Sequence, residues 1–104
     1  MHIAIITPYA EPEYGACSRR IKSFTEYFLS QGHTVTVLAP ARRTFTNPYN
    51  QVIRYKKISE MQKILSKIKP DAIIGTSPPI THSFFALITA KFKKIPFILD
   101  VRDP

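Results

Sequence analysis

The sequence predicts an α/β fold built on an open, Rossmann-like parallel sheet. Short apolar runs rich in β-branched residues, such as Ile3–Ile6 and the segment 71–77, are typical of strands that are buried on both faces. Between these runs lie segments whose apolar residues recur at spacings of three and four, which indicates helices. Because parallel strands are joined by right-handed crossovers, this alternation predicts the strand order 3-2-1-4-5 with helices on both faces.

The first half of the chain begins with the strand at 3–6, which a proline ends. A helix is expected over 16–31, because apolar side chains share one face there: Ile21, Phe24 and Phe28. Gly32 suits the left-handed cap that ends such helices. A second strand at 33–38 and a short third strand at 51–58 are expected to follow.

In the second half, Ser59 and Gln62 have the spacing of a capping box, which predicts that a helix begins there and continues to Ile68. After the strand at 71–77 comes a very apolar helix. Its large side chains are expected to pack deep against the sheet: Phe84, Phe85, Leu87, Ile88 and Phe92. Residues 95–99 are the fifth predicted strand.

Composition narrows the class of protein. A chain of 104 residues with 44% hydrophobic residues can form one hydrophobic core. Its 15 Lys and Arg against seven Asp and Glu give a net charge of +8, which favours phosphates, nucleic acids or anionic lipids as partners. The single cysteine, Cys17, excludes an internal disulfide and indicates a reducing compartment. Since neither a membrane-spanning run nor a signal peptide is recognisable, we expect a cytoplasmic protein, at most peripheral at the inner membrane face.

The loops that follow the strands are predicted to converge at one edge of the sheet. Ligands of open α/β sheets bind at the carboxyl ends of the strands, where four loops would meet: 7–18, 39–49, 75–81 and 100–104. Gly15 lacks a Cβ, so a diphosphate can approach its backbone, and the helix that begins beside it adds partial positive charge. We therefore expect a phosphate-bearing ligand there. The alternative is that Gly15 only makes the turn.

Four segments together resemble the amino-terminal domain of family-4 glycosyltransferases with the GT-B fold. They occur in the family's order and span nearly the whole chain: TPYAEPEYGACSRR, QGHTVTVL, KPDAIIGTSPP and IPFILDVRD. The branch that builds bacterial surface polysaccharides on lipid carriers is the most similar. The resemblance implies retaining sugar transfer from a nucleotide sugar to a glycan or lipid-linked acceptor, with no metal and no further cofactor. It also implies that residues 1–104 are a truncated, acceptor-side domain, inactive without the carboxyl-terminal nucleotide-sugar domain.

The resemblance assigns phosphate or donor binding to the first loop, at Gly15, Ala16 and Arg19. In the family this turn usually carries two glycines, and Ala16 stands at the second of these positions. Arg19 lies in the first helical turn, where a cation opposes the helix dipole unless an anion compensates. A solvated basic face, which includes Arg20, is the alternative. Tyr14 could border a sugar or a lipid-linked acceptor, or be an ordinary exposed tyrosine.

The other predicted site residues follow the fourth and fifth strands. Thr76 and Ser77 offer hydroxyls to an acceptor, with helix capping by Ser77 as the alternative. Arg102 and Asp103 are the predicted catalytic residues, Arg102 binding a phosphate or sugar hydroxyl and Asp103 an acceptor hydroxyl. In many relatives a histidine lies near the position of Arg102. An ion pair that only supports the fold, with Asp100 on the same side as Arg102, is the alternative.

Other functions have less support in the sequence. Arg42 and Arg43 could meet the 2′-phosphate of NADP, but with glycines only at 15, 32 and 75 neither a G-x-G-x-x-G nor a P-loop motif exists. The histidines show no metal-ligand spacing, so no metal site is expected. A free-standing basic module that binds nucleic acid or an anionic membrane remains the alternative function, with lysines between 56 and 69 as its basic face. The aromatic residues form no RNA-binding signature, which makes nucleic acid the less favoured of these partners.

Overall fold

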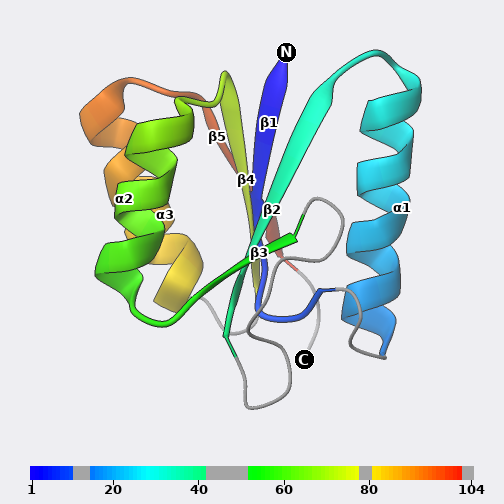
Figure 1. Cartoon of the computed structure of the whole chain (residues 1–104), viewed down its shortest axis with the longest axis horizontal. Helices are drawn as coiled ribbons and strands as arrows, with labels where there is room; N and C mark the ends of the chain where they lie inside the picture. The colour runs from blue at the N-terminus through cyan, green and yellow to red at the C-terminus, as the bar shows by residue number, and fades with distance from the viewer. Residues whose placement is uncertain (11–14, 42–51, 78–80, 102–104) are drawn as a thin grey trace.

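The computed structural model describes residues 1–10, 15–41, 52–77 and 81–101. Its elements in chain order are β1 (His2–Ile6), α1 (Ala16–Ser30), β2 (Thr34–Pro40), β3 (Val52–Tyr55), α2 (Ile58–Ile68), β4 (Ala72–Ser77), α3 (Thr81–Lys93) and β5 (Phe97–Val101). All described strand pairs are parallel, and the sheet has the order β3-β2-β1-β4-β5. The predicted α/β class and strand order are confirmed (Figure 1).

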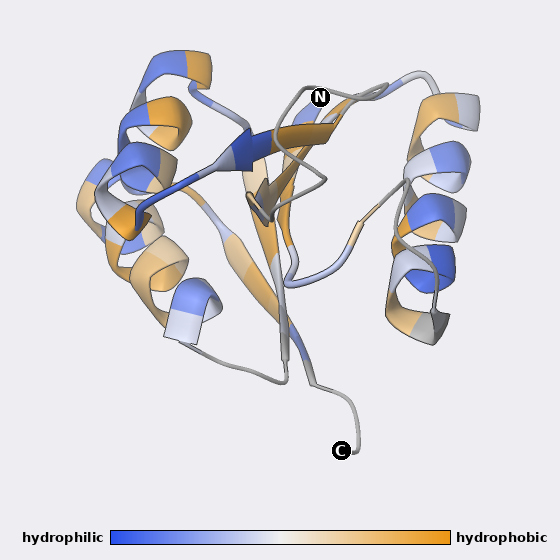
Figure 2. Cartoon of the chain, turned by 60° about the horizontal axis from the view of Figure 1, so that its bottom comes forward, coloured by the Kyte–Doolittle hydropathy of each residue, from blue (hydrophilic) through white to orange (hydrophobic). Residues whose placement is uncertain are grey.

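The sheet lies between two helical layers, with α1 on one face and α2 and α3 on the other (Figure 1). Strand β1 shows why its sequence is an unbroken apolar run. Ile3 and Ile5 belong to the core under α1, whereas Ala4 and Ile6 belong to the core under α2 and α3. Neither face of the strand meets water, so alternation with polar residues is absent. Figure 2 shows the apolar strands enclosed between helices of mixed hydropathy.

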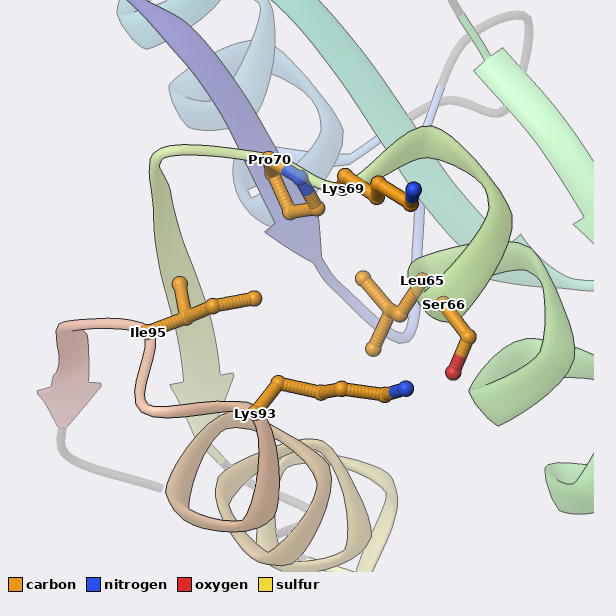
Figure 3. A pocket seen from close by; sticks show the side chains of 6 residues that line it. All are labelled: Leu65, Ser66, Lys69, Pro70, Lys93 and Ile95. Atoms are coloured by element: carbon orange, nitrogen blue, oxygen red, sulfur yellow. The ribbon is translucent and has the colours of Figure 1, made fainter.

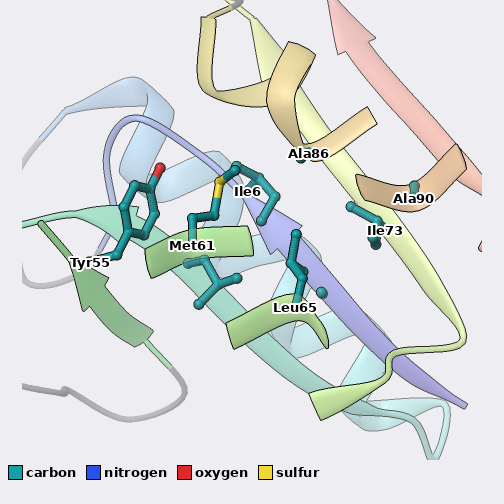
Figure 4. Close-up of a cluster of buried hydrophobic side chains, with 9 residues drawn as sticks. Ile6, Tyr55, Met61, Leu65, Ile73, Ala86 and Ala90 are labelled. Carbon is teal, nitrogen blue, oxygen red and sulfur yellow. The ribbon is translucent and has the colours of Figure 1, made fainter. Parts of the chain in front are cut away.

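The core under α2 and α3 is built from strands and from both helices (Figure 4). Its largest member is Tyr55, at the end of β3, whose ring is almost fully buried. The Tyr55 hydroxyl lies 2.6 Å from Nδ1 of His82 in the first turn of α3, so the polar tip of the ring has a partner. Met61 and Leu65 fill the space between β1 and α2.

The orientation of α3 differs from the prediction. Its small residues face the sheet: Ser83, Ala86, Thr89 and Ala90. Of the large apolar residues, Phe85 packs partly against the core, but Phe84, Leu87 and Ile88 are 40% to 51% exposed and Phe92 is 85% exposed. The prediction that all five pack deep against the sheet is therefore wrong.

The close approach of α3 to the sheet explains this orientation. A Cβ added to Gly75 would lie 2.6 Å from the Phe97 ring and 2.8 Å from Oγ of Ser83. Ser83 also donates a 2.7 Å hydrogen bond from its hydroxyl to the carbonyl of Thr76. Only small side chains fit between the helix axis and strands this close, so the large ones point outward.

Several predicted boundaries move in the structure: the strand expected at 33–38 is Thr34–Pro40, and the one expected at 51–58 is only Val52–Tyr55. Helix α2 begins at Ile58 after Lys57, which has extended backbone angles and no side-chain cap, so Ser59 lies inside the first turn and the predicted capping box does not form. Strand β5 starts two residues later than predicted and continues to Val101, pairing with β4 as far as Ser77. Within the described part of the chain, no helix has the length and apolar character needed to cross a membrane.

Adding a methyl group at Gly75 should test the close packing of α3 on the sheet. Gly75→Ala should lower the free energy of unfolding by about 1–3 kcal/mol, measured by urea denaturation, because the new Cβ overlaps Phe97 and Ser83. Phe97→Leu in the same chain removes the ring tip that lies nearest, so the double variant should recover part of the loss. Strictly additive losses would contradict this packing.

Candidate functional site at the carboxyl edge of the sheet

The carboxyl ends of the parallel strands meet at one edge of the sheet, where α1 and α3 also begin (lower part of Figure 1). We call this the carboxyl edge. It carries the ends of β1, β2, β4 and β5, as the predicted convergence of four loops requires. Three predicted site residues lie outside the described residues: Tyr14, Arg102 and Asp103. Arg42 and Arg43, weighed only for an NADP site, also lie outside them.

Gly15 is the residue immediately before α1. Its backbone has φ 131° and ψ 168°, and an added Cβ would meet nothing within 4 Å. Glycine is therefore required here by the backbone angles and not by crowding. The Gly15 carbonyl accepts the first helical hydrogen bond from the Arg19 amide at 3.1 Å, so the turn and the helix form one continuous unit.

The amino-terminal end of α1 has no negative group of its own. Its first turn contains no acidic residue, and no side chain caps it. Ala16 is the first helical residue, and Arg19 is exposed without an ion-pair partner among the described residues. The free amide groups, the helix dipole and the Arg19 guanidinium together favour an anion at this end.

Arg20 has a partner that the sequence analysis did not identify. Its Nε and Nη2 donate hydrogen bonds of 3.1 Å and 2.9 Å to the two carboxylate oxygens of Asp100 near the end of β5. Its guanidinium also lies over the Phe24 ring, 4.9 Å from the centroid. The hydrogen bond to Asp100 raises the pKa of Arg20 above its ordinary value, so the arginine stays charged. Arg20, whose side chain is 39% exposed, is therefore an ion-paired arginine and not only part of a solvated basic face.

This ion pair joins the first turns of α1 to the end of β5, across 80 positions of sequence. Alternation along β5 explains the geometry: Ile74 packs in the core under α1 and is paired with Ile98, so Asp100, two residues on, lies on the same face of the sheet. Asp100 was expected to share a side with Arg102. Arg102 lies outside the described residues, and the observed partner of Asp100 is Arg20.

The hydroxyl of Thr76 is used inside the protein. Thr76 is buried, and its Oγ1 donates to the carbonyl of Ile6 at 3.3 Å, which ties β4 to β1. Thr76 and Ser77 are the last two residues of β4 and do not follow it. Because Thr76 is 3% exposed and its hydroxyl proton is donated to Ile6, this hydroxyl is not placed to donate to a bound acceptor.

Thr7 and Arg54 hold the loops that leave the strands, and neither was singled out in the sequence. Thr7, which follows β1, donates from its hydroxyl to the Tyr9 carbonyl at 3.0 Å, and Sγ of Cys17 lies 3.5 Å from the same hydroxyl. Arg54, only 7% exposed, donates to the carbonyls of Pro40 at 3.1 Å and of Ala10 at 3.0 Å. The sequence did offer one signal for a structural role of Arg54, because this arginine lies inside the otherwise apolar strand VIRY.

No group of three or more His, Cys, Asp or Glu suited to a metal occurs within 1–10, 15–41, 52–77 and 81–101. A cavity of about 260 Å³ lies at the opposite edge of the sheet, between the last turns of α2 and α3. It is lined by Leu65, Ser66, Lys69, Pro70, Lys93 and Ile95 (Figure 3). It is therefore separate from the carboxyl edge.

Comparison with known proteins does not assign the chain to a family. No protein-family model matches the chain, and no curated protein matches it. Among solved structures, the crystal structure of S. aureus homoserine dehydrogenase is similar with a TM-score of 0.47 and 11% sequence identity. The match covers 97% of this chain and 33% of that chain, so the present chain spans about a third of that enzyme's length. A likeness at this level says nothing about activity.

The coupling between Arg20 and Asp100 can be measured by a double-mutant cycle. Arg20→Gln and Asp100→Asn should each lower the free energy of unfolding in urea, and the double variant should lose less than the sum, because each single change removes the same ion pair. Arg19→Gln is the matched control, since Arg19 has no ion-pair partner among the described residues, and it should add to Asp100→Asn. Additive losses for Arg20 and Asp100 would contradict the pairing.

Proposed function

We propose that this chain is the acceptor-side, amino-terminal portion of a metal-independent, retaining glycosyltransferase. It would act with a second domain that binds the nucleotide sugar, and the sugar would pass to a lipid-linked glycan acceptor. The observation that supports this best is the Arg20–Asp100 ion pair. It brings together the start of α1 and the end of β5, the two segments to which the sequence resemblance assigns phosphate binding and catalysis.

The start of α1 is the proposed phosphate site. Gly15 has the backbone angles of a turn that only glycine adopts readily, and the first turn of the helix contains no acidic residue. A diphosphate could accept hydrogen bonds from the free amides of this turn and pair with the Arg19 guanidinium. Arg20 is not assigned this role, because its guanidinium charge is already paired with the Asp100 carboxylate.

The segment after β5 is the proposed catalytic side. Asp100 is fixed by Arg20, and just beyond it Arg102 and Asp103 would bind a phosphate or sugar hydroxyl and an acceptor hydroxyl. Ser77 at the end of β4 and Tyr14 of the first loop are the proposed acceptor contacts, since the Thr76 hydroxyl already bonds to Ile6.

The proposed location is the cytoplasm, where nucleotide sugars meet the inner membrane face. The chain by itself is expected to bind its ligands but not to catalyse sugar transfer.

A titration with phosphate-bearing ligands tests this proposal. Addition of geranyl diphosphate or a uridine diphosphate sugar to the ¹⁵N-labelled chain should shift the amide signals of Gly15 and Arg19, because the ligand binds at the start of α1. Arg19→Gln removes a charge-assisted hydrogen bond and should weaken binding about tenfold. Lys63→Gln, the same loss of charge at an exposed position of α2 in the opposite layer, should leave the affinity unchanged.

Absence of shifts at the carboxyl edge with every phosphate-bearing ligand would overturn the proposal. So would equal weakening by Arg19→Gln and Lys63→Gln, because that result indicates a response to net charge and not to a site.

A further inference from the structure

The outer face of α3 is apolar and basic at once. Its large side chains point away from the sheet, with Phe84, Ile88 and Phe92 four residues apart along one line of the helix. Lysines flank the end of this line: Lys91, Lys93 and Lys94, all exposed. We call these six residues, together with Leu87, the α3 surface. The α3 sequence contains no acidic residue.

These lysines have no partner within the described ranges 1–10, 15–41, 52–77 and 81–101. Lys91, Lys93 and Lys94 form no ion pair there. The acidic residues of the chain's described part lie elsewhere. Glu60 is in the first turn of α2, Asp71 accepts a 2.7 Å bond from the His2 amide, and the remaining two are Glu26 on α1 and Asp100 at the carboxyl edge. The positive charge beside Phe92 is therefore uncompensated by the residues described.

A cavity adjoins the same end of α3. The side chains of Lys69 and Lys93 extend along its walls, Ser66 contributes a hydroxyl, and Leu65 and Ile95 make the wall apolar (Figure 3). Ammonium and hydroxyl groups beside apolar walls suit an anionic head group joined to a hydrocarbon chain. Lysines in a last helical turn also offset the helix dipole, but that role explains neither the exposure of Phe92 nor the cavity.

We propose that the α3 surface docks on an anionic phospholipid bilayer, with α3 lying in the plane of the interface. Phe84, Ile88 and Phe92 would enter the boundary between head groups and acyl chains, while the lysines pair with lipid phosphates. Phe92 is 85% exposed, more than any other large apolar residue of the α3 surface. It would therefore gain most from moving out of water into the lipid.

Charge and apolarity together select this occupant. A second copy of the chain would bring positive charge against positive charge, at a net +8 each. A nucleic acid would satisfy the lysines but would leave the line of apolar side chains against a phosphate backbone. An anionic lipid surface offers both a negative layer and an apolar layer. The inference does not require glycosyl transfer. It would, however, hold the carboxyl edge, where α3 begins, close to the lipid head groups.

Binding to vesicles tests the proposal. The chain should co-sediment with phosphatidylcholine vesicles that contain about a third phosphatidylglycerol and not with pure phosphatidylcholine, and added salt should weaken binding. Phe92→Ser should weaken it about tenfold and Lys93→Glu at least about fivefold. The matched controls lie on α1 in the opposite layer: Tyr27→Ser, whose side chain is 61% exposed, and Lys22→Glu, at an exposed position, should both bind as the unchanged chain does.

A fluorescence experiment reports insertion directly, because the chain contains no tryptophan. Phe92→Trp should show a blue-shifted emission and protection from aqueous quenchers when anionic vesicles are added. Tyr27→Trp, on the other layer, should show neither change. Circular dichroism confirms that each variant is folded, which exposed positions should tolerate.

Three results would overturn the proposal. The first is that the chain does not bind anionic vesicles, and the second is that the α1 and α3 substitutions weaken binding equally. The third is that lipid does not change the emission of the Phe92→Trp variant. Tight binding of an RNA or DNA oligonucleotide that depends on Lys93 but not on Phe92 would assign the surface to nucleic acid instead. A concentration-dependent dimer that Phe92→Ser abolishes would assign it to a second copy.

The proposed sugar-carrier site can fail independently of this surface. Loss of diphosphate binding by Arg19→Gln with vesicle binding intact would separate the two, because Arg19 lies on α1 and Phe92 on α3.

Discussion

Parallel strands must be covered on both faces, and this requirement decides where every other feature of the chain lies. Helix α1 on one face and α2 with α3 on the other bury β1 so completely that Ile3 to Ile6 alternate between two cores. The crossovers needed for parallel strands bring the carboxyl ends to one edge. At that edge the Arg20–Asp100 ion pair joins the start of α1 to the end of β5. The candidate site is thus a result of topology, fixed by one long-range contact.

The sequence was sufficient to predict the fold, but it did not predict which face of α3 packs against the sheet. Strand order followed from the alternation of buried strands and helices and from right-handed crossovers, which are local signals and a general rule. In α3 apolar residues surround the axis, so periodicity cannot tell which side meets the sheet. That choice depends on Gly75, which lets the helix approach until only small residues such as Ser83 and Ala86 fit beneath it. Such spacing is a tertiary property, and no pattern within the helix contains it.

The site residues divide in the same way. The turn at Gly15 was predictable, because a glycine before a helix is a local signal, and the residue has positive φ. The partnership of Arg20 with Asp100 was not, since it joins residues 80 positions apart. Arg54 was also missed, because an isolated polar residue in an apolar strand looks exposed until its neighbours are known. Thr76 shows the converse: its place near the edge was predictable, but the direction of its hydroxyl was not.

The central claim is that the start of α1 and the end of β5 form one edge that binds a phosphorylated sugar carrier. A crystal structure of the chain with a short polyprenyl diphosphate would test it most directly. We predict that the phosphate oxygens lie within hydrogen-bonding reach of the first amides of α1, beside Gly15 and Arg19 and on the same edge as Asp100. A structure in which the diphosphate is bound elsewhere on the chain, with none at the start of α1, would contradict this claim.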